Sequence, residues 1–206
     1  MWGFERCILM IKNLVFDIYN VIIRFNREKQ IRLNNLTQDD LDFIWSMFGN
    51  DLWNECDLGK YYGKSCFTEQ LIELYPNREK QIRRILSRPW STYMECIERV
   101  TKYFEPMSKD YDLYIISNIC EEEFDFVRNQ PWFRFFKGHH CSFEAGIMKP
   151  EKEIFTQFLD KYGLKAEECL FIDDSTVNVQ AAGELGFNVI QFDGKKNYFS
   201  KIKKSL

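Results

Sequence analysis

The chain has 206 residues, of which 45% are hydrophobic, and its 28 basic and 31 acidic side chains give a formal charge of -3. This length suits one domain with a modest insertion, and the hydrophobic content excludes global disorder. Because the charges nearly balance, the composition does not indicate a basic surface for binding nucleic acid or an anionic membrane, and we expect neither partner. No apolar window has the length of a membrane helix, so we expect a cytoplasmic location.

The first predicted element is a buried strand that ends in a charge. The apolar residues Leu14–Phe16 are followed directly by Asp17, and apolar character resumes at Val21–Ile23 after Tyr19 and Asn20. A short apolar run of this kind is typical of a strand in a parallel sheet. Because the strand begins soon after Met10, we also expect Met10 to be the natural start of the protein.

The stretch from residue 26 to residue 89 has helical periodicity and no convincing buried strand. It predicts helices over residues 37–48, 68–74 and 78–86, with a Gly-containing connection from Gly49 to Ser65. We therefore expect a helical cap at 26–89, inserted after the first strand of a core formed by 1–25 and 90–206.

The C-terminal half alternates short apolar runs with helical segments. Predicted strands cover 112–118, 169–174 and 188–192, and predicted helices run from Pro150 to Gly163 and from Ser175 to Gly186. Strands that alternate with helices form parallel sheets with crossover connections. The predicted fold class is α/β, a doubly wound parallel sheet with a small helical cap.

Polar side chains stand at the ends of three of these strands. In an open parallel sheet, residues that follow the carboxyl ends of the strands converge on one crevice. The residues concerned are Asp17 after the first strand, Ser117 and Asn118 after the second, Asp173 and Asp174 after the third, and Lys149 before the helix at Pro150.

These groups together suit phosphoryl transfer. Asp17 and Asp174 on neighbouring strands would repel each other without a cation, and carboxylate oxygens are ligands that Mg²⁺ prefers. Ser117 and Lys149 would hold the other phosphoryl oxygens. Asp17 could then attack phosphorus in line and form an aspartyl-phosphate.

Four motifs in this order resemble those of the haloacid dehalogenase-like (HAD) hydrolase superfamily, and especially small bacterial members of the sugar-phosphatase type. The motifs are LVFDIYNVII, IISN, GIMKPEKEIF and LFIDDSTVNVQAAGELGF. The resemblance implies a Rossmann-like core and hydrolysis of a small phosphorylated metabolite such as a sugar phosphate, with Mg²⁺ as cofactor. It assigns the nucleophile and a metal ligand to Asp17, phosphate binding to Ser117 with Asn118 beside it, charge balance to Lys149, and metal binding to Asp174 with its acidic neighbour Asp173.

Tyr19 departs from the pattern that the resemblance implies. Most phosphatases of the superfamily have a second aspartate there, which serves as general acid and base, while its backbone carbonyl binds the metal. Tyrosine keeps the carbonyl and loses the carboxylate, and a phenol with a pKa of about 10 is a poor base at neutral pH. We therefore expect slow turnover that favours substrates with good leaving groups.

Two alternatives remain open. The 2-haloacid dehalogenases of the superfamily have D-x-Y in the first motif and use no metal, but their fourth motif resembles S-x-N-x-x-D, whereas this chain has DDSTVN. A catalytically weak protein that binds a phosphorylated ligand would also tolerate Tyr19. Retention of Asp17, Ser117, Lys149 and Asp174 argues against it.

Several other residues allow both a functional and a structural interpretation. Asn178 orients a metal-bound water or makes a helix contact. Arg24, Asn26 and Arg27 contact a phosphate or sugar, or form a solvated helix start. In the cap segment, Asp51, Trp53, Glu55 and Asp57 contact substrate hydroxyls, although Trp53, Trp90 and Trp132 are more typical of packing. The run His139–Cys141 is expected to be structural, because adjacent residues on a strand point to opposite sides. Cys120 is expected to be a bystander, because no histidine is obviously positioned as its base.

Overall fold

A five-stranded parallel sheet forms the centre of the protein. The computed structural model describes residues 11–47, 51–61 and 64–194, so Met10 and Phe48 lie outside the described residues. The strands lie in the order β5-β4-β1-β6-β7. Their bounds are β1 Asn13–Phe16, β4 Asp112–Ser117, β5 Phe136–Cys141, β6 Cys169–Asp173 and β7 Asn188–Gln191.

Strand β1 occupies the middle of this sheet. Its first residue, Asn13, pairs in parallel with Asp112 of β4 on one side and with Cys169 of β6 on the other. Because all neighbouring strands run the same way, the residues that follow β1, β4 and β6 share one edge of the sheet. The predicted α/β class and parallel sheet are confirmed, and His139–Cys141 lie in β5 as a strand.

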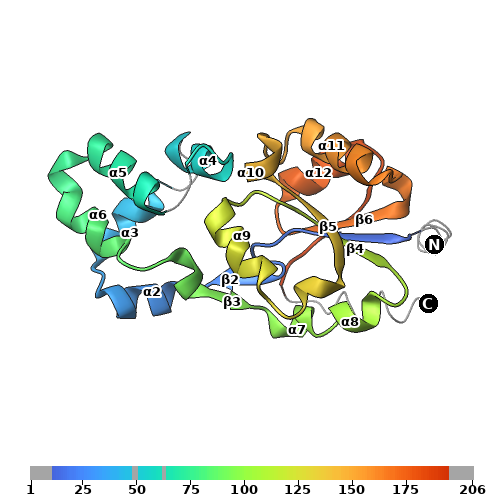
Figure 1. The fold of residues 1–206 in the computed structure, drawn as a ribbon, viewed down its shortest axis with the longest axis horizontal. Helices are drawn as coiled ribbons and strands as arrows, with labels where there is room; N and C mark the ends of the chain where they lie inside the picture. The colour runs from blue at the N-terminus through green and yellow to red at the C-terminus, as the bar shows by residue number, and fades with distance from the viewer. Residues whose placement is uncertain (1–10, 48–50, 62–63, 195–206) are drawn as a thin grey trace.

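Helices cover both faces of the sheet (Figure 1). Their bounds are α7 Glu98–Thr101, α8 Phe104–Met107, α9 Glu121–Arg128, α10 Ser142–Ala145, α11 Lys152–Tyr162 and α12 Thr176–Glu184. In β1, Leu14 and Phe16 belong to a core cluster with residues of α7, α8 and α9, whereas Val15 belongs to a cluster with residues of α11 and α12. A strand buried on both faces explains the continuous apolar run in its sequence.

The helical insertion follows β1 and a short antiparallel ribbon. The ribbon pairs β2 Ile23–Phe25 with β3 Met94–Cys96, where the chain leaves and re-enters the sheet part. The insertion contains α2 Arg27–Asn34, α3 Gln38–Trp45, α4 Asp51–Asp57, α5 Lys64–Leu74 and α6 Glu79–Ile85. The sequence did not predict the ribbon, whose strands have three residues each, or α4, which lies in the expected connection. Helix α11 begins at Lys152, two residues after Pro150, because Glu151 is its N-cap.

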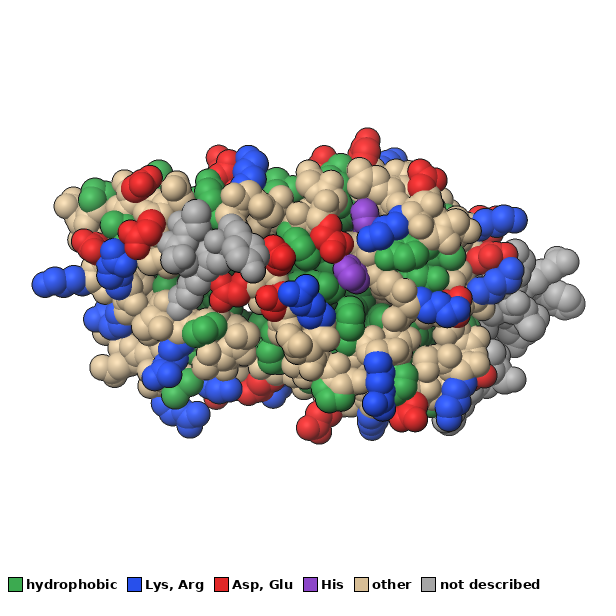
Figure 2. Space-filling model, in the orientation of Figure 1, with side chains coloured by type: hydrophobic (Ala, Val, Ile, Leu, Met, Phe, Trp, Pro, Cys, Tyr) green, Lys and Arg blue, Asp and Glu red, His purple; other side chains and the backbone are tan. Residues whose placement is uncertain are grey.

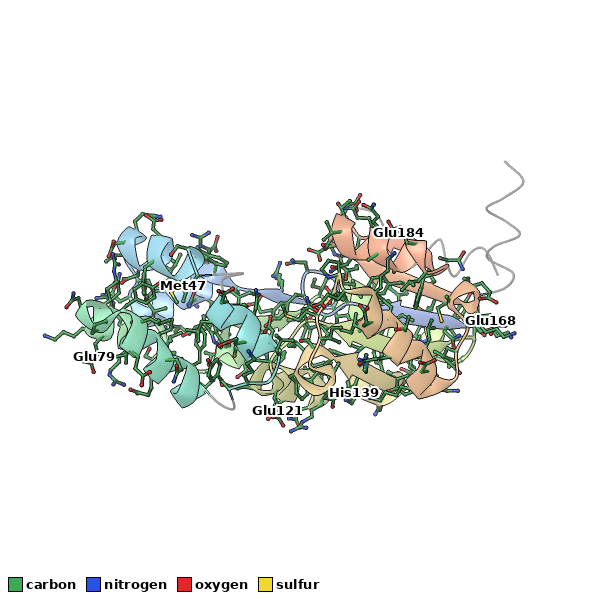
Figure 3. The ribbon with its side chains drawn as sticks, turned by 90° about the horizontal axis from the view of Figure 1, so that it is seen from above. Met47, Glu79, Glu121, His139, Glu168 and Glu184 are labelled. Atoms are coloured by element: carbon green, nitrogen blue, oxygen red, sulfur yellow. The ribbon has the colours of Figure 1, made fainter. Side chains whose placement is uncertain are left out.

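The insertion buries its own hydrophobic cluster. Leu41, Ile44 and Leu71 pack there with Ile82 and other apolar side chains from α3 to α6. Met47 and Glu79 lie at the far end of the molecule from Glu168 in Figure 3. The cluster extends beyond residue 89, since it includes Trp90 and Tyr93, and the boundaries 26–89 stay a prediction.

The surface agrees with the near-neutral composition. On the face shown in Figure 2, acidic and basic side chains are interspersed over both lobes. Among the described residues, every helix falls short of the length and apolar character needed to cross a bilayer.

We expect Asn34 to stabilise the packing of the helical insertion, because it joins α2 to α6 and to Tyr93. Its buried side chain donates to the Ile85 carbonyl at 2.8 Å and accepts from the Tyr93 hydroxyl at 2.9 Å. Asn34→Leu should lower the free energy of unfolding by about 1–3 kcal/mol, because it leaves both buried partners unsatisfied. Urea denaturation measures this, with the exposed Asn129→Ala as control. Adding Tyr93→Phe should recover part of the loss, and a strictly additive double variant would contradict this account.

Candidate active site

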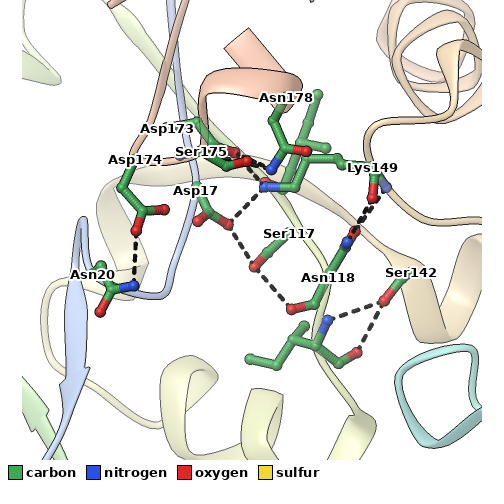
Figure 4. A network of polar contacts seen from close by, with 12 residues as sticks. Asp17, Asn20, Ser117, Asn118, Ser142, Lys149, Asp173, Asp174, Ser175 and Asn178 are labelled. Carbon is green, nitrogen blue, oxygen red and sulfur yellow. Dashed lines mark hydrogen bonds and ion pairs between the residues drawn. The ribbon is translucent and has the colours of Figure 1, made fainter. Parts of the chain in front are cut away.

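The ammonium group of Lys149 joins two carboxylates at the edge of the sheet (Figure 4). Its Nζ lies 2.8 Å from Asp17 Oδ1 and 2.6 Å from Asp173 Oδ2, and it donates to the Ile116 carbonyl at 3.1 Å. The Lys149 side chain is 2% exposed, and those of Asp17 and Asp173 are 8% and 0% exposed. The three charges are therefore buried as one group, and each depends on the others.

The parallel sheet positions the acidic members of this group. Asp17 follows β1, and its backbone N–H donates to the Ile172 carbonyl of β6 at 2.9 Å. Asp173 is the last residue of β6, and Ser117 is the last residue of β4. The Ser117 hydroxyl donates to Asp17 Oδ1 at 2.8 Å. Residues that are about 100 or more positions apart in the chain thus meet because their strands end at the same edge.

Asn118 holds Lys149 in place. Its Nδ2 donates to the Lys149 carbonyl at 2.9 Å, and its Oδ1 accepts from the Lys149 backbone N–H at 2.8 Å. Both ends of the amide are bonded to the loop that carries the lysine. The predicted contact between the Asn118 side chain and substrate is untested, and in this structure the side chain acts on the position of Lys149.

Burial shifts the pKa values of these groups in opposing ways. Desolvation raises the pKa of Asp17 to about 6, although the nearby Lys149 ammonium lowers it. Burial alone would lower the pKa of Lys149, but the Asp17 and Asp173 carboxylates outweigh it and leave this pKa raised. Lys149 therefore stays charged, and Asp17 is ionised above about pH 6.

The two acids of the fourth motif have different surroundings. Asp173 is bonded on both oxygens: Oδ1 accepts from the Ser175 backbone N–H at 2.8 Å, and Asn178 Nδ2 lies 3.2 Å and 3.1 Å from the two oxygens. Asp174 is half-buried, and its Oδ2 accepts from Asn20 at 2.8 Å. Burial raises the pKa of Asp174. Asn178 thus orients Asp173, which favours its helix-contact interpretation.

The donor set fits a hard divalent cation. Carboxylate oxygens of Asp17, Asp173 and Asp174 lie within 4.8 Å of one another. Three carboxylates and one ammonium leave an excess of negative charge, and oxygen ligands of this kind suit Mg²⁺. Since Asp173 is already fully bonded, Asp17 and Asp174 are the more available ligands. Ligation by the Tyr19 carbonyl stays a prediction.

The Tyr19 side chain lies beside a second acidic cluster. Burial, followed by the charge of Glu123 in α9, raises the pKa of Tyr19 well above its usual value. Oxygen atoms of Glu123 and Asp57 and the Cys120 sulfur lie within 4.8 Å of one another. Burial raises the pKa of Asp57 to about 7 and that of Glu123 to about 8, with a further rise at Glu123 from Asp57.

The sequence did not single out Glu123, and it treated Cys120 as a bystander. Glu123 lies on the first turn of α9, in the run Glu121–Glu123, where acidic residues are common near a helix N-terminus. No spacing in the sequence distinguishes it from its half-buried neighbours Glu121 and Glu122, so only the fold identifies it.

Of the other residues that the sequence singled out as possible substrate contacts, some bond protein side chains and others line a cavity. Arg24 and Asn26 bond Glu95 of β3, and Asn26 also caps α2. The Arg27 guanidinium lies 4.7 Å from the centroid of the Trp45 ring. In α4, Asp51 is exposed and Glu55 bonds Lys60 and Tyr61. Trp53 and Asp57 line a cavity between the insertion and the sheet part, with Trp90, and Trp132 packs in the core.

Comparison with known proteins finds one family over most of the chain. A protein-family model described as haloacid dehalogenase-like hydrolase matches residues 11–186. D-ribitol-5-phosphate phosphatase from Bacteroides thetaiotaomicron is 28% identical over 192 residues, which are 88% of this chain and 92% of that protein.

Solved structures share the fold. A HAD-like family hydrolase from Porphyromonas gingivalis superposes with a TM-score of 0.75 at 28% identity, over 95% of this chain and 97% of that one. A HAD family enzyme from Bacteroides thetaiotaomicron in complex with magnesium and inorganic phosphate has a TM-score of 0.72 at 23% identity, over 90% of this chain and 96% of that one.

We expect Lys149→Met to destabilise the protein strongly. The change leaves the buried carboxylates of Asp17 and Asp173 without their cation, and breaking a buried ion pair from one side costs about 3–5 kcal/mol. The matched control is Lys152→Met, because Lys152 pairs with Glu184 at the surface and should change stability by about 0.5 kcal/mol or less. Chemical denaturation of both variants measures the difference. Equal free energies of unfolding would show that the group does not act as one unit.

Proposed function

This chain belongs to the haloacid dehalogenase-like hydrolase family, and we propose that it is a magnesium-dependent phosphomonoester hydrolase that acts through an aspartyl-phosphate on Asp17. The observation that carries the proposal is the state of Asp17. One of its oxygens is bonded by Ser117 and Lys149, and among the described residues the structure gives no hydrogen bond to the other oxygen. A carboxylate held on one side and open on the other is oriented for attack.

Each residue has a role in the proposed reaction. Asp17 attacks phosphorus, the bond to the leaving oxygen breaks, and the phosphoryl group is transferred to the carboxylate. The Lys149 ammonium and the Ser117 hydroxyl stabilise charge on the phosphoryl oxygens. Water then attacks phosphorus and releases phosphate, which restores Asp17. A magnesium ion held by Asp17 and Asp174 would neutralise phosphate charge when bound.

The relatives support a phosphorylated small molecule as substrate. The relative from Bacteroides thetaiotaomicron is named as a phosphatase of D-ribitol 5-phosphate, and this chain spans most of its length. A second relative, at 22% identity over 85% of this chain, is named as a sesquiterpene phosphatase from Aspergillus oryzae. The leaving alcohols of these two proteins differ widely. We therefore take from them only that the substrate is a phosphomonoester, and we do not take from them the identity of its alcohol.

The dehalogenase alternative is supported by Tyr19 and opposed by the acidic pair. A 2-haloacid carries its own carboxylate, which would lie beside Asp17, Asp173 and Asp174 with only Lys149 to balance them. Like charges at this separation repel strongly in a buried site. The same excess of negative charge favours a site that binds a metal and a phosphate together.

We expect phosphate release from p-nitrophenyl phosphate in the presence of Mg²⁺ and none after chelation. Asp17→Asn should lower kcat by about 10³-fold or more, because the amide cannot act as the nucleophile. Asp110→Asn, at an exposed position before β4, is the matched control and should keep full activity. Colorimetric phosphate detection measures both.

Two outcomes of complementary assays would replace this proposal. Halide release from a 2-haloacid without Mg²⁺ would establish the dehalogenase. Calorimetric binding of phosphate esters without turnover of any of them would establish a binding protein.

We also expect the rate to depend steeply on the leaving group. Burial and the nearby charge of Glu123 raise the pKa of the Tyr19 phenol, so it is a weaker proton donor than a carboxyl group in that position. Loss of a general acid lowers rates by about 10²–10⁴-fold for leaving groups that need a proton. Aryl and acyl phosphates should therefore be hydrolysed at least about 10²-fold faster than simple alkyl phosphates. Steady-state kinetics on a series of esters measures the slope, and equal rates would contradict the assigned role of Tyr19.

A further inference from the structure

A cavity of about 320 Å³ lies between the helical insertion and the sheet part, next to the candidate active site. Tyr19, Asn20 and Asn118, which line it, are chain neighbours of Asp17 and Ser117. Its volume is at the lower end of the range for small-molecule sites. A group bonded to a phosphate at Asp17 would therefore extend into this cavity.

The walls of the cavity are aromatic and acidic. Five aromatic side chains line it, namely Tyr19, Phe25, Trp45, Trp53 and Trp90. The rings of Trp53 and Trp90 have centroids 5.6 Å apart, and those of Phe25 and Trp90 are 5.4 Å apart, so these side chains fix one another. The carboxyl groups of Asp57 and Glu123 are also on the walls, and the described lining contains no Lys, Arg or His.

The two carboxyl groups approach each other, and the described lining of the cavity brings no basic side chain to them. Their oxygens lie within 4.8 Å, and Glu123 is 5% exposed. Among the described residues, the structure gives the Asp57 side chain no hydrogen bond or ion pair. Glu123 is buried and Asp57 is half-buried, and two carboxylates this close in such surroundings need a positive charge or a proton between them.

The position of Asp57 is set by the core. Its backbone carbonyl accepts from the Ser142 hydroxyl at 2.6 Å, and the same hydroxyl accepts from the Ile119 N–H at 3.0 Å. Ser142 therefore ties the end of α4 to the loop after Asn118. Asp57 is the last residue of α4 in the insertion, whereas Glu123 lies in α9 of the sheet part. The cluster is thus built from both parts of the molecule.

We propose, on the basis of the proposed phosphatase activity, that this cavity binds a leaving group that carries a substituted ammonium ion, as in a phosphate ester of an amino alcohol. Aromatic faces attract ammonium groups, and they do so most strongly where water is excluded. Trp45 already accepts a cation in this way, since the Arg27 guanidinium lies 4.7 Å from its ring centroid. The Asp57 and Glu123 carboxylates supply the opposite charge, whereas a small metal ion would require oxygen ligands in place of the aromatic carbon.

The same walls exclude other leaving groups. An anionic alcohol, such as one that carries a carboxylate or a second phosphate, would face two acidic groups and, among the described lining residues, no basic one. A neutral alcohol would make packing contacts and hydrogen bonds without the electrostatic gain. The order of preference is therefore cationic, neutral and anionic.

Product inhibition tests this proposal without the influence of leaving-group chemistry. Choline and 3,3-dimethylbutanol have nearly the same shape and differ in the positive charge. We expect choline to inhibit hydrolysis of p-nitrophenyl phosphate with a Ki at least about 10-fold lower than that of 3,3-dimethylbutanol. Glu123→Gln and Asp57→Asn, which keep the shape of each side chain, should each reduce that ratio toward one. Glu121→Gln, on the same turn of α9 but outside the cavity lining, should leave the ratio unchanged.

Each outcome separates this inference from the proposed function. Equal Ki values for the two alcohols, or variants that keep the wild-type ratio, would overturn the ammonium site while leaving the phosphatase intact. Without hydrolysis of p-nitrophenyl phosphate, calorimetric titration of choline and 3,3-dimethylbutanol into the wild-type protein still tests the cavity. If one variant fails to fold, as judged by circular dichroism, the other carries the comparison. Phosphocholine should also be hydrolysed with a higher kcat/KM than 3-phosphoglycerate, and the reverse order would contradict the proposal.

Discussion

The contact of one buried ammonium with two buried carboxylates is the interaction on which this site depends. Lys149 Nζ lies within 2.8 Å of both Asp17 and Asp173, and all three side chains are nearly or fully buried. Charges in such surroundings are tolerated only when they are paired and hydrogen-bonded. The pairing keeps Lys149 charged at neutral pH, and it orients one oxygen of Asp17 while it leaves the other available for chemistry.

Further hydrogen bonds hold the members of this ion pair in position. Asn118 bonds both backbone groups of Lys149, and Asn178 together with the Ser175 N–H bonds Asp173. These residues follow the strands β4 and β6, so the sheet determines where they lie. Supporting hydrogen bonds of this kind hold a reacting group close to its productive geometry before substrate arrives. Asp174 is less constrained, since it is half-buried and accepts one side-chain hydrogen bond, from Asn20.

The replacement at position 19 connects the reacting group to the second acidic cluster. In the proposed reaction, tyrosine at this position supplies no carboxylate beside the leaving oxygen, and its side chain lines the adjacent cavity together with Glu123. The same substitution thus affects the chemistry of the leaving group and the shape and charge of the place that receives it. A site without an efficient proton donor loses least rate with a leaving group that departs readily without a proton. A positive charge near the leaving oxygen helps in the same way, because it stabilises the developing alkoxide.

The sequence by itself determined the α/β class, the parallel strands and the residues Asp17, Ser117, Lys149, Asp173 and Asp174 as one candidate site. It could do so because an apolar run that ends in a polar residue has a local signature, and because parallel strands must end at a common edge. Only the tertiary structure decided which partners each group has. It showed that Asn118 holds Lys149, that Asp173 is bonded on both oxygens, and that Glu123 and Asp57 lie close together beside Tyr19. Glu123 and Asp57 are 66 positions apart and belong to different parts of the molecule, so their contact depends on how the helical insertion packs on the sheet, and no local pattern of residues encodes that packing.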